Sequence, residues 1–177
     1  MSSKEYLQYF PHPEIRDAQV HAIDRALAAY AAGKRFVIIE AGTGVGKSAI
    51  GLTIARYLDD RYSTNDDYDR GAWFITTQKI LQDQYINDYG PPAGKLCSIK
   101  SSTNYTCSFH KKHTCSQSQQ LLKAEDKSSK FFKACTFNCR YKNEKKKFLN
   151  AAESVTNFPY FMTEAAYSGK IEPRNFL

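Results

Sequence analysis

The stretch RFVIIEAGTGVGKS, residues 35–48, decides the fold of this chain. Its first half, RFVIIE at 35–40, is short, apolar and β-branched, which is typical of a buried parallel strand. Its second half, AGTGVGKS at 41–48, matches the Walker A pattern G-x-x-x-x-G-K-[ST] at its last three positions, with Ala41 in place of the first glycine. Because an amphipathic helix is predicted over 47–62, the pattern has the strand–loop–helix context of a phosphate-binding loop.

The residue types in this loop suit the binding of a nucleoside triphosphate. Glycines let successive N–H groups turn toward phosphate oxygens, and the positive end of the following helix faces the same anion. Lys47 would place its charge on the β- and γ-phosphates, and the Ser48 hydroxyl would hold Mg²⁺, so these two are the predicted catalytic residues. Nothing in the loop separates ATP from GTP. The predicted nucleotide-binding residues of the loop are Ala41, Gly42, Thr43, Gly44, Val45, Gly46, Lys47 and Ser48.

Hydrophobic periodicity predicts alternating helices and strands around the loop. Helical spacing covers 14–30 and 78–89, a buried strand is predicted at 72–77, and RNFL at 174–177 resembles the start of another strand. Such alternation favours right-handed crossovers. We therefore predict an α/β fold of the P-loop NTPase (RecA-like) class, with a partial parallel sheet and helices on both faces.

A cysteine-rich segment interrupts this pattern. All five cysteines lie within 97–139, in a polar, Ser- and Lys-rich stretch that is poor in Val and Ile, with one weakly amphipathic helix predicted over 117–134. We expect an insertion folded around something other than an apolar core. The predicted domain organisation is a first part of the motor domain at 1–95, the insertion at 96–149, and a return to the motor domain at 150–177.

The excess positive charge lies in the insertion. Residues 95–150 hold 13 Lys and Arg against three acids, whereas the remainder holds 12 against 15. A local basic patch of this kind favours a polyanionic partner. No apolar stretch approaches the ~20 residues of a membrane span, and the N-terminus lacks the apolar core of a signal peptide. We expect an intracellular protein, where clustered thiols indicate metal binding rather than disulfides.

Taken together, these motifs resemble the DinG/XPD family of superfamily 2 iron–sulfur DNA helicases. The resemblance covers nearly the whole chain, as the N-terminal part of a first motor domain, and that family commonly has alanine first in the loop. PEIRDAQ at 13–19 resembles the family's R-x-x-Q signature, which implies that Arg16 and Gln19 contact adenine and favour ATP.

TTQKILQDQ at 76–84 resembles motif Ia of the same family, where a strand end and the next helix meet the DNA backbone. The resemblance implies that Thr76, Thr77 and Gln78 hydrogen bond to phosphates, a contact that positions DNA without recognising its sequence. A purely structural alternative is that a threonine caps the next helix.

The insertion resembles the family's [4Fe–4S] segment. SSTNYTC at 101–107 is similar to the region of the first ligand, CRY at 139–141 to that of the last, and TNFPYFMTEA at 156–165 to the stretch before the next core strand. The implied ligands are Cys107, Cys115, Cys135 and Cys139, which leaves Cys97 spare. Zinc is the competing metal, with His110 and His113 as further donors, although neither the C-x7-C nor the C-x3-C spacing matches the common C-x2-C knuckle.

The expected partner is single-stranded or forked DNA, with lysines on phosphates and aromatic rings on bases. The predicted DNA-binding residues of the insertion are Tyr105, Lys111, Lys112, Tyr141, Lys142, Lys145, Lys146 and Lys147. The family implies an ATP-dependent helicase of 5′-to-3′ polarity. Because the family continues past RNFL into a DEAH-type Walker B box, this chain alone is expected to hydrolyse ATP negligibly. The alternative is a nucleotide- and nucleic-acid-binding module without turnover, stabilised by zinc.

Overall fold

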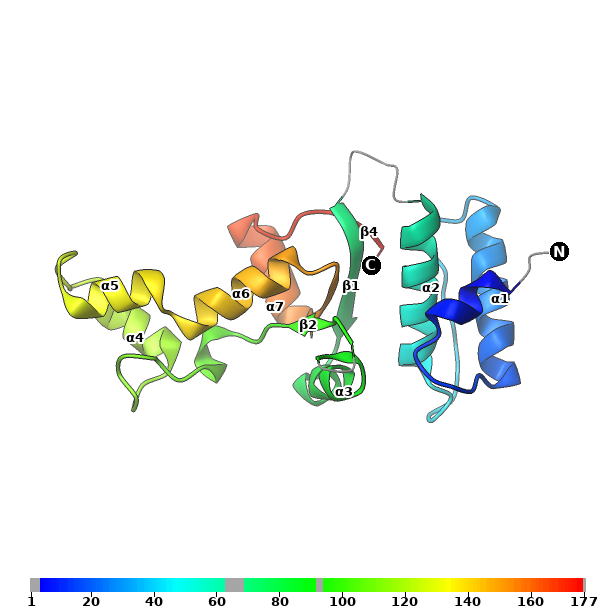
Figure 1. Cartoon of the computed structure of the whole chain (residues 1–177). Helices are drawn as coiled ribbons and strands as arrows, with labels where there is room; N and C mark the ends of the chain where they lie inside the picture. Colours follow the sequence, from blue (N-terminus) through cyan, green and yellow to red (C-terminus); the bar gives the residue numbers. More distant parts are fainter. Residues whose placement is uncertain (1–3, 63–68, 92–93, 177) are drawn as a thin grey trace. The chain divides into compact units, whose positions relative to one another are not determined.

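The computed structural model describes residues 4–62, 69–91 and 94–176. They form two compact units, of which the first runs to Ala72 and includes Arg174–Phe176, and the second spans Trp73–Pro173. Strand β1 (Asp69–Thr76) passes from the first unit into the second. Figure 1 shows the elements of each unit in chain order.

The first unit is helical around a small apolar core, with one strand pair. Its elements are the 3₁₀ helix Glu5–Tyr9, α1 (Asp17–Ala31), α2 (Lys47–Tyr62), the start of β1, and β4 (Arg174–Phe176). The two strands pair in parallel, with Asp69 opposite Arg174. The predicted helices at 14–30 and 47–62 and the predicted C-terminal strand are thereby confirmed, although Leu177 lies outside the described residues. The core consists of Tyr6, Ile23, Ile50, Tyr57 and Leu58.

The predicted buried strand at 35–40 is wrong in this structure. The segment runs before the Walker A loop without strand pairing among the described residues, and Phe36 and Ile38 are 86% and 95% exposed. Hydrophobic pattern alone cannot make a strand, because a strand needs a neighbour to accept and donate its main-chain hydrogen bonds. A groove of about 700 Å³ is lined by this segment and α1.

The second unit is built on β2 (Cys97–Ser98), β3 (Glu153–Asn157) and the end of β1. The strand order of the whole sheet is β2-β3-β1-β4, and β2 pairs with β3 in parallel, which confirms the α/β class with parallel strands. Three helices contact these strands, namely α3 (Lys79–Tyr89), α6 (Arg140–Asn150) and α7 (Phe158–Thr163), the last followed by a π-helical turn at Glu164–Ser168. The core consists of Trp73, Ile99, Phe148 and Tyr160.

The insertion contains helix where one was predicted, but that central helix is divided in two. The expected helix at 117–134 is replaced by α4 (Cys115–Leu122) and α5 (Lys130–Phe137), which Figure 1 shows at the end of the insertion away from β2 and β3. The break has a local cause, because the Ser129 side chain accepts a hydrogen bond from the Phe132 N–H and so starts a new helix.

The compact units do not follow the predicted domain borders at 95 and 150. The insertion shares its unit with α3, β3 and α7, so the three-part organisation stays a prediction. Among the described helices, none has the length and apolar character needed to cross a bilayer.

The packing of the second unit makes a stability prediction. Phe148 is 1% exposed and its ring centroid lies 5.1 Å from that of Trp73, the single tryptophan of the chain. Phe148→Ala should lower the free energy of unfolding by about 3–5 kcal/mol, because it leaves a cavity in the core. Urea denaturation followed by tryptophan fluorescence measures this loss. The matched control is Phe137→Ala, at a ring that is 74% exposed, which should change stability by no more than about 0.5 kcal/mol.

Candidate functional site

The Walker A loop turns sharply before α2 begins at Lys47. Gly44 and Gly46 have φ angles of 77° and 82°, in the left-handed region that favours glycine. Gly42 is not in that region, and a Cβ built on it would meet no atom within 4 Å. The prediction that glycines shape the loop is therefore confirmed for Gly44 and Gly46, whereas the backbone conformation does not require glycine at position 42.

Positive charge is concentrated where the loop meets the helix. The exposed Lys47 donates from Nζ to the carbonyl oxygens of Ala41 at 3.0 Å and Gly42 at 2.8 Å. Both acceptors are neutral, so the ammonium charge is not offset by these contacts. Ser48 is half-buried in the first turn of α2, and Thr43 is exposed in the loop. A lysine, a helix N-terminus and left-handed glycines together suit a polyphosphate anion.

The R-x-x-Q signature lies against this loop. Arg16 Nη1 donates to the Gly44 carbonyl, and Gln19 Nε2 donates to the Val45 carbonyl, each at 2.9 Å. Gln19 is only 5% exposed. The signature and the Walker A loop thus belong to one site, as the resemblance implies, while contact with adenine stays a prediction.

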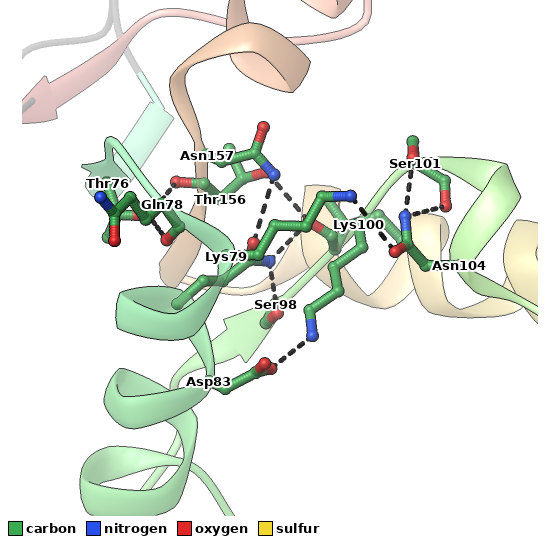
Figure 2. A network of polar contacts seen from close by, with 12 residues as sticks. Thr76, Gln78, Lys79, Asp83, Ser98, Lys100, Ser101, Asn104, Thr156 and Asn157 are labelled. Atoms are coloured by element: carbon green, nitrogen blue, oxygen red, sulfur yellow. Dashed lines mark hydrogen bonds and ion pairs between the residues drawn. The ribbon is translucent and has the colours of Figure 1, made fainter.

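A second site lies where β2 and β3 end beside α3. The side chain of Gln82, buried in α3, donates from Nε2 to the Ser98 hydroxyl and the Ile99 carbonyl, both at 2.7 Å. The Asn157 side chain, at the end of β3, donates to Gln82 Oε1 at 3.3 Å and accepts from the Tyr160 N–H at 3.1 Å. This network, part of which Figure 2 shows, ties two strand ends to two helices.

The residues predicted to form motif Ia divide between the interior and the surface. Thr76 is 7% exposed, and its Oγ1 donates to the Gln78 carbonyl at 3.0 Å and lies 3.4 Å from the Thr156 carbonyl (Figure 2). Its hydroxyl is used inside the protein, which argues against the predicted contact with DNA. The capping alternative does not hold for Thr76 either, because Gln78 is the N-cap residue of α3 and the Thr76 hydroxyl donates to a carbonyl. Thr77 and Gln78 are exposed just before α3.

Two lysines that sequence reasoning missed flank this loop. Lys79 Nζ lies 3.3 Å from Asn104 Oδ1, and Lys100 Nζ lies 2.5 Å from Asp83 Oδ1 (Figure 2). Asn104 is fixed in turn by a bond from Nδ2 to the Ser101 hydroxyl at 2.7 Å. Because Asn104 is neutral, its contact does not offset the charge of Lys79. Lys79 lies within the stretch that resembles motif Ia, which was the available sequence signal, but nothing local indicates that Asn104 meets it.

Four of the five cysteines line one cavity in the insertion, where Ser118 also contributes. These are Cys107, Cys115, Cys135 and Cys139. The Sγ atoms of Cys115 and Cys139 are 3.6 Å apart, while Cys97 lies in β2 and does not line the cavity. The predicted ligand set is therefore brought together. However, no three histidine, cysteine or acidic side chains in the described part of the chain form a group that could hold a metal ion as they stand.

The thiols in this cavity differ in their ease of ionisation. Burial, followed by the neighbouring Cys139 thiol, raises the pKa of Cys115 to about 12. Burial also acts on Cys107, but the nearby Ser118 hydroxyl and the His110 N–H outweigh it and lower the pKa of that thiol. The buried Ser118 hydroxyl meets no partner at full hydrogen-bond geometry among the described residues. An apolar pocket of crowded thiols disfavours thiolates unless a cation joins them.

Comparison with known proteins agrees with the geometry of the loop. The family model described as type III restriction enzyme, res subunit (ResIII) matches residues 12–158. The chain belongs to the ResIII family. ResIII is a P-loop family of helicase superfamily 2, so the chain is of the type that uses ATP and Mg²⁺ and binds nucleic acid. Searches of curated proteins and of solved structures found no match.

The basic surface of this ResIII chain is smaller than its lysine count suggests. Lys145 Nζ lies 2.6 Å from Glu164 Oε2, and both side chains are largely buried. Burial acts to raise the pKa of Glu164, but hydrogen bonds from Lys145 and Ser168 outweigh it and lower that pKa. Lys145 thus has a structural partner, which argues against its predicted contact with DNA. The lysines of the predicted set that remain exposed are Lys111, Lys112, Lys142, Lys146 and Lys147, the last paired with Glu144 at 2.9 Å.

The aromatic residues of the ResIII insertion also divide into two groups. Tyr105 and Tyr141 are half-buried, with ring centroids 5.4 Å apart, and the Tyr141 hydroxyl lies 3.1 Å from that of Tyr160. These two rings therefore belong mainly to the packing of the unit, contrary to their predicted role as base-stacking platforms. Phe109 and Phe137 are 44% and 74% exposed and can stack on bases.

Proposed function

We propose that this ResIII chain is the N-terminal part of the first motor domain of an ATP-dependent DNA helicase of the DinG/XPD type, with 5′-to-3′ polarity. The observation that carries the proposal is the convergence of Cys107, Cys115, Cys135 and Cys139 on one cavity in a segment that separates α3 from β3. Four thiols at one cavity in such a segment are the ligand set that a thiolate-bound metal group needs.

In this proposal the Walker A loop binds the triphosphate of Mg-ATP. The N–H groups of the loop and the start of α2 face the phosphates, Lys47 supplies the charge on the β- and γ-phosphates, and Ser48 holds Mg²⁺. The Lys47 ammonium contacts two neutral carbonyls of the loop, which do not offset its charge, and this supports the role.

The insertion has the features that a thiolate-bound metal group needs. Around the cysteines, the buried cluster among the described residues consists of Cys107, Phe131 and Cys135, with Leu122 packed against them, which is a small apolar core. Bonds from one metal group to four thiolates would cross-link α4, α5 and the start of α6. The Ser118 hydroxyl lies beside the Cys107 thiol and has no partner at full hydrogen-bond geometry in the described part of the chain, so it can donate to a metal-bound sulfur.

A [4Fe–4S] cluster is the proposed group, and zinc is the alternative that one distance favours. A tetrahedral zinc with Zn–S bonds of about 2.3 Å holds its sulfurs roughly 3.8 Å apart. The 3.6 Å between Cys115 and Cys139 is close to that spacing, whereas a cluster with one iron on each thiolate holds its sulfurs farther apart. His110 and His113 do not line the cavity, so the zinc alternative also reduces to the four cysteines.

The proposed contact surface for single-stranded DNA has two parts. One part is the loop before α3 with its neighbours, where Thr77, Gln78, Lys79 and Asn104 offer exposed donors to backbone phosphates. The other part is the insertion, where exposed lysines would follow the backbone and Phe109 and Phe137 would stack on bases. By analogy with the DinG/XPD family, the insertion is the element past which the strands of a duplex separate.

Nucleotide binding can be measured directly by titration calorimetry. The chain should bind Mg-ATP, and Lys47→Ala should weaken binding about 10- to 100-fold, since charge-assisted hydrogen bonds contribute about 1.5–3 kcal/mol. The matched control is Lys34→Ala, which removes an exposed lysine outside the loop and should leave the affinity unchanged. Equal affinities for the parent chain and the Lys47 variant would contradict a phosphate role for this lysine.

The metal is identified by purification without oxygen. We expect a brown protein with broad thiolate-to-iron absorption and about four irons per chain. Serine at Cys107, Cys115, Cys135 or Cys139 should remove the colour, whereas Cys97→Ser, the matched control, should keep it. Because binding releases thiol protons, metal affinity should rise with pH. Colourless protein with one zinc per chain would favour the zinc alternative, and protein purified in this way without any bound metal would rule out a metal group.

DNA binding should weaken steeply with salt, because each phosphate neutralised on a single strand adds about 0.7 to the log–log slope. Changing Lys111 and Lys112 to alanine should reduce the slope by about 0.7 for each phosphate that is no longer neutralised. Fluorescence anisotropy with a labelled oligonucleotide provides the measurement, and Lys170→Ala is the control at an exposed lysine outside the proposed surface.

Lys145→Ala separates structural from DNA-binding lysines in the same assay. The change should lower the thermal stability of the chain, because Glu164 loses its ion-pair partner. The salt dependence of DNA affinity should stay the same. The proposed surface would be contradicted if the salt dependence of DNA affinity stayed the same in the Lys111 and Lys112 variant but became weaker in Lys145→Ala.

A further inference from the structure

One face of α4 lines the cysteine cavity. The residues of α4 that contribute to the cavity wall are Cys115, Ser118, Gln119 and Leu122. Their spacing corresponds to positions i, i+3, i+4 and i+7, which share one side of a helix. The two polar residues of this face, Ser118 and Gln119, therefore lie on the same side of α4 as Cys115.

Ser118 has a buried hydroxyl that the described part of the chain does not satisfy. The residue is 1% exposed, and its Oγ has no partner at full hydrogen-bond geometry among the described residues. A serine or threonine in a helix can donate to the carbonyl four residues earlier, as Thr53 does to Ala49 at 2.7 Å and Thr136 to Phe132 at 2.9 Å. Ser118 does not use that option, although a buried hydroxyl without a partner is unfavourable. Its hydroxyl is therefore available to a group in the cavity.

The Cys107 thiol lies beside the Ser118 hydroxyl. Its sulfur already accepts a hydrogen bond from the His110 N–H at 3.3 Å. The main chain holds this residue in place, because the Cys107 N–H donates to the His113 carbonyl at 2.9 Å. A neutral thiol is a weak acceptor, whereas a metal-bound thiolate is negatively charged and accepts more strongly. Metal binding at Cys107 would therefore supply Ser118 with the partner that it lacks.

Hydrogen-bond donors are unevenly distributed over the four cysteines of the cavity. Cys115 Sγ lies 3.7 Å from Gln119 Nε2, which is a longer contact than the one between Cys107 and the main chain. In the described part of the chain, the sulfurs of Cys135 and Cys139 receive no hydrogen bond from a residue other than cysteine. The Cys107 sulfur is thus the ligand best supplied with donors.

We propose that Ser118 is a positioning residue of the metal site, whose hydroxyl donates to the metal-bound Cys107 sulfur. The inference rests on the proposed function, in which Cys107 and the other three cavity cysteines bind a metal group. It assigns a role in that site to a residue that is not itself a ligand. The hydrogen bond stabilises negative charge on the sulfur and fixes its direction, and both effects favour the metal-bound thiolate over the free thiol.

Cobalt(II) provides the test, because Co²⁺ bound by thiolates absorbs light through charge transfer from sulfur to metal. The reduced, metal-free 177-residue chain is titrated with Co²⁺ without oxygen. Ser118→Ala should weaken Co²⁺ binding about 10- to 100-fold, as is typical when a hydrogen-bond partner of a metal ligand is removed. The charge-transfer band should also move to longer wavelength, because a sulfur without this hydrogen bond releases its electron more easily.

Two further variants separate the hydroxyl from the packing of α4. Ser118→Thr keeps the hydroxyl and should keep the affinity and the band of the parent chain. Ser116→Ala, on the same helix but not lining the cavity, is the matched control and should bind like the parent. Thermal unfolding verifies that each variant is folded. If Ser118→Thr is not folded, Ser118→Ala, whose smaller side chain fits where serine fits, decides by its band position.

Each outcome supports or overturns the role of Ser118. Equal affinity and an equal band in Ser118→Ala and the parent would overturn it. Weaker binding with an unchanged band would also overturn it, because a packing defect alone lowers affinity without changing the charge on sulfur. If the parent chain does not bind Co²⁺ through its thiolates, the metal group of the proposed function fails as well. A failure of the Ser118 role alone leaves Co²⁺ binding by the parent intact.

Discussion

The Gln82 side chain is the polar contact on which the second unit depends. Its buried amide hydrogen bonds to Ser98, Ile99 and Asn157, which lie at or just beyond the ends of β2 and β3. Each buried donor or acceptor left without a partner costs about 1–3 kcal/mol, so no apolar residue of similar size can replace this amide without loss. The exposed loop before α3 and the turn that carries Asn104 leave from these same elements. Their relative position is therefore set by a contact that is shielded from solvent.

The sequence pattern correctly predicted those elements that are determined by residues close to one another in the chain. The helices at 17–31 and 47–62 and the conformations of Gly44 and Gly46 depend on residues near in sequence, and the chain pattern contains that information. The strand expected at 35–40 failed for the opposite reason, because strand pairing needs a distant neighbour. Thr76 shows the same limit, since its exposure depends on Thr156, eighty positions away.

Candidate site residues follow the same rule. Resemblance to known motifs grouped the four cysteines and assigned Gln19 to the nucleotide site, and the structure brings the cysteines together at one cavity and Gln19 against the Walker A loop. The sequence did not indicate that Lys145 pairs with Glu164. A lysine-rich run looks the same in the sequence whether its side chains face solvent or an acidic residue. Gln82 lies within the stretch that resembles motif Ia, but nothing in the sequence distinguishes a buried amide there from an exposed one, because its partners are distant in sequence.

The exposed segment 35–40 has a consequence for the behaviour of the chain in solution. Phe36 and Ile38 are almost fully accessible, in an apolar, β-branched run without proline. Extended segments of this composition act as templates for main-chain pairing with other chains and are typical starting points of aggregation. Association through this segment grows with protein concentration. A strand that paired with this segment would satisfy its main-chain groups and remove an aggregation site in the same step.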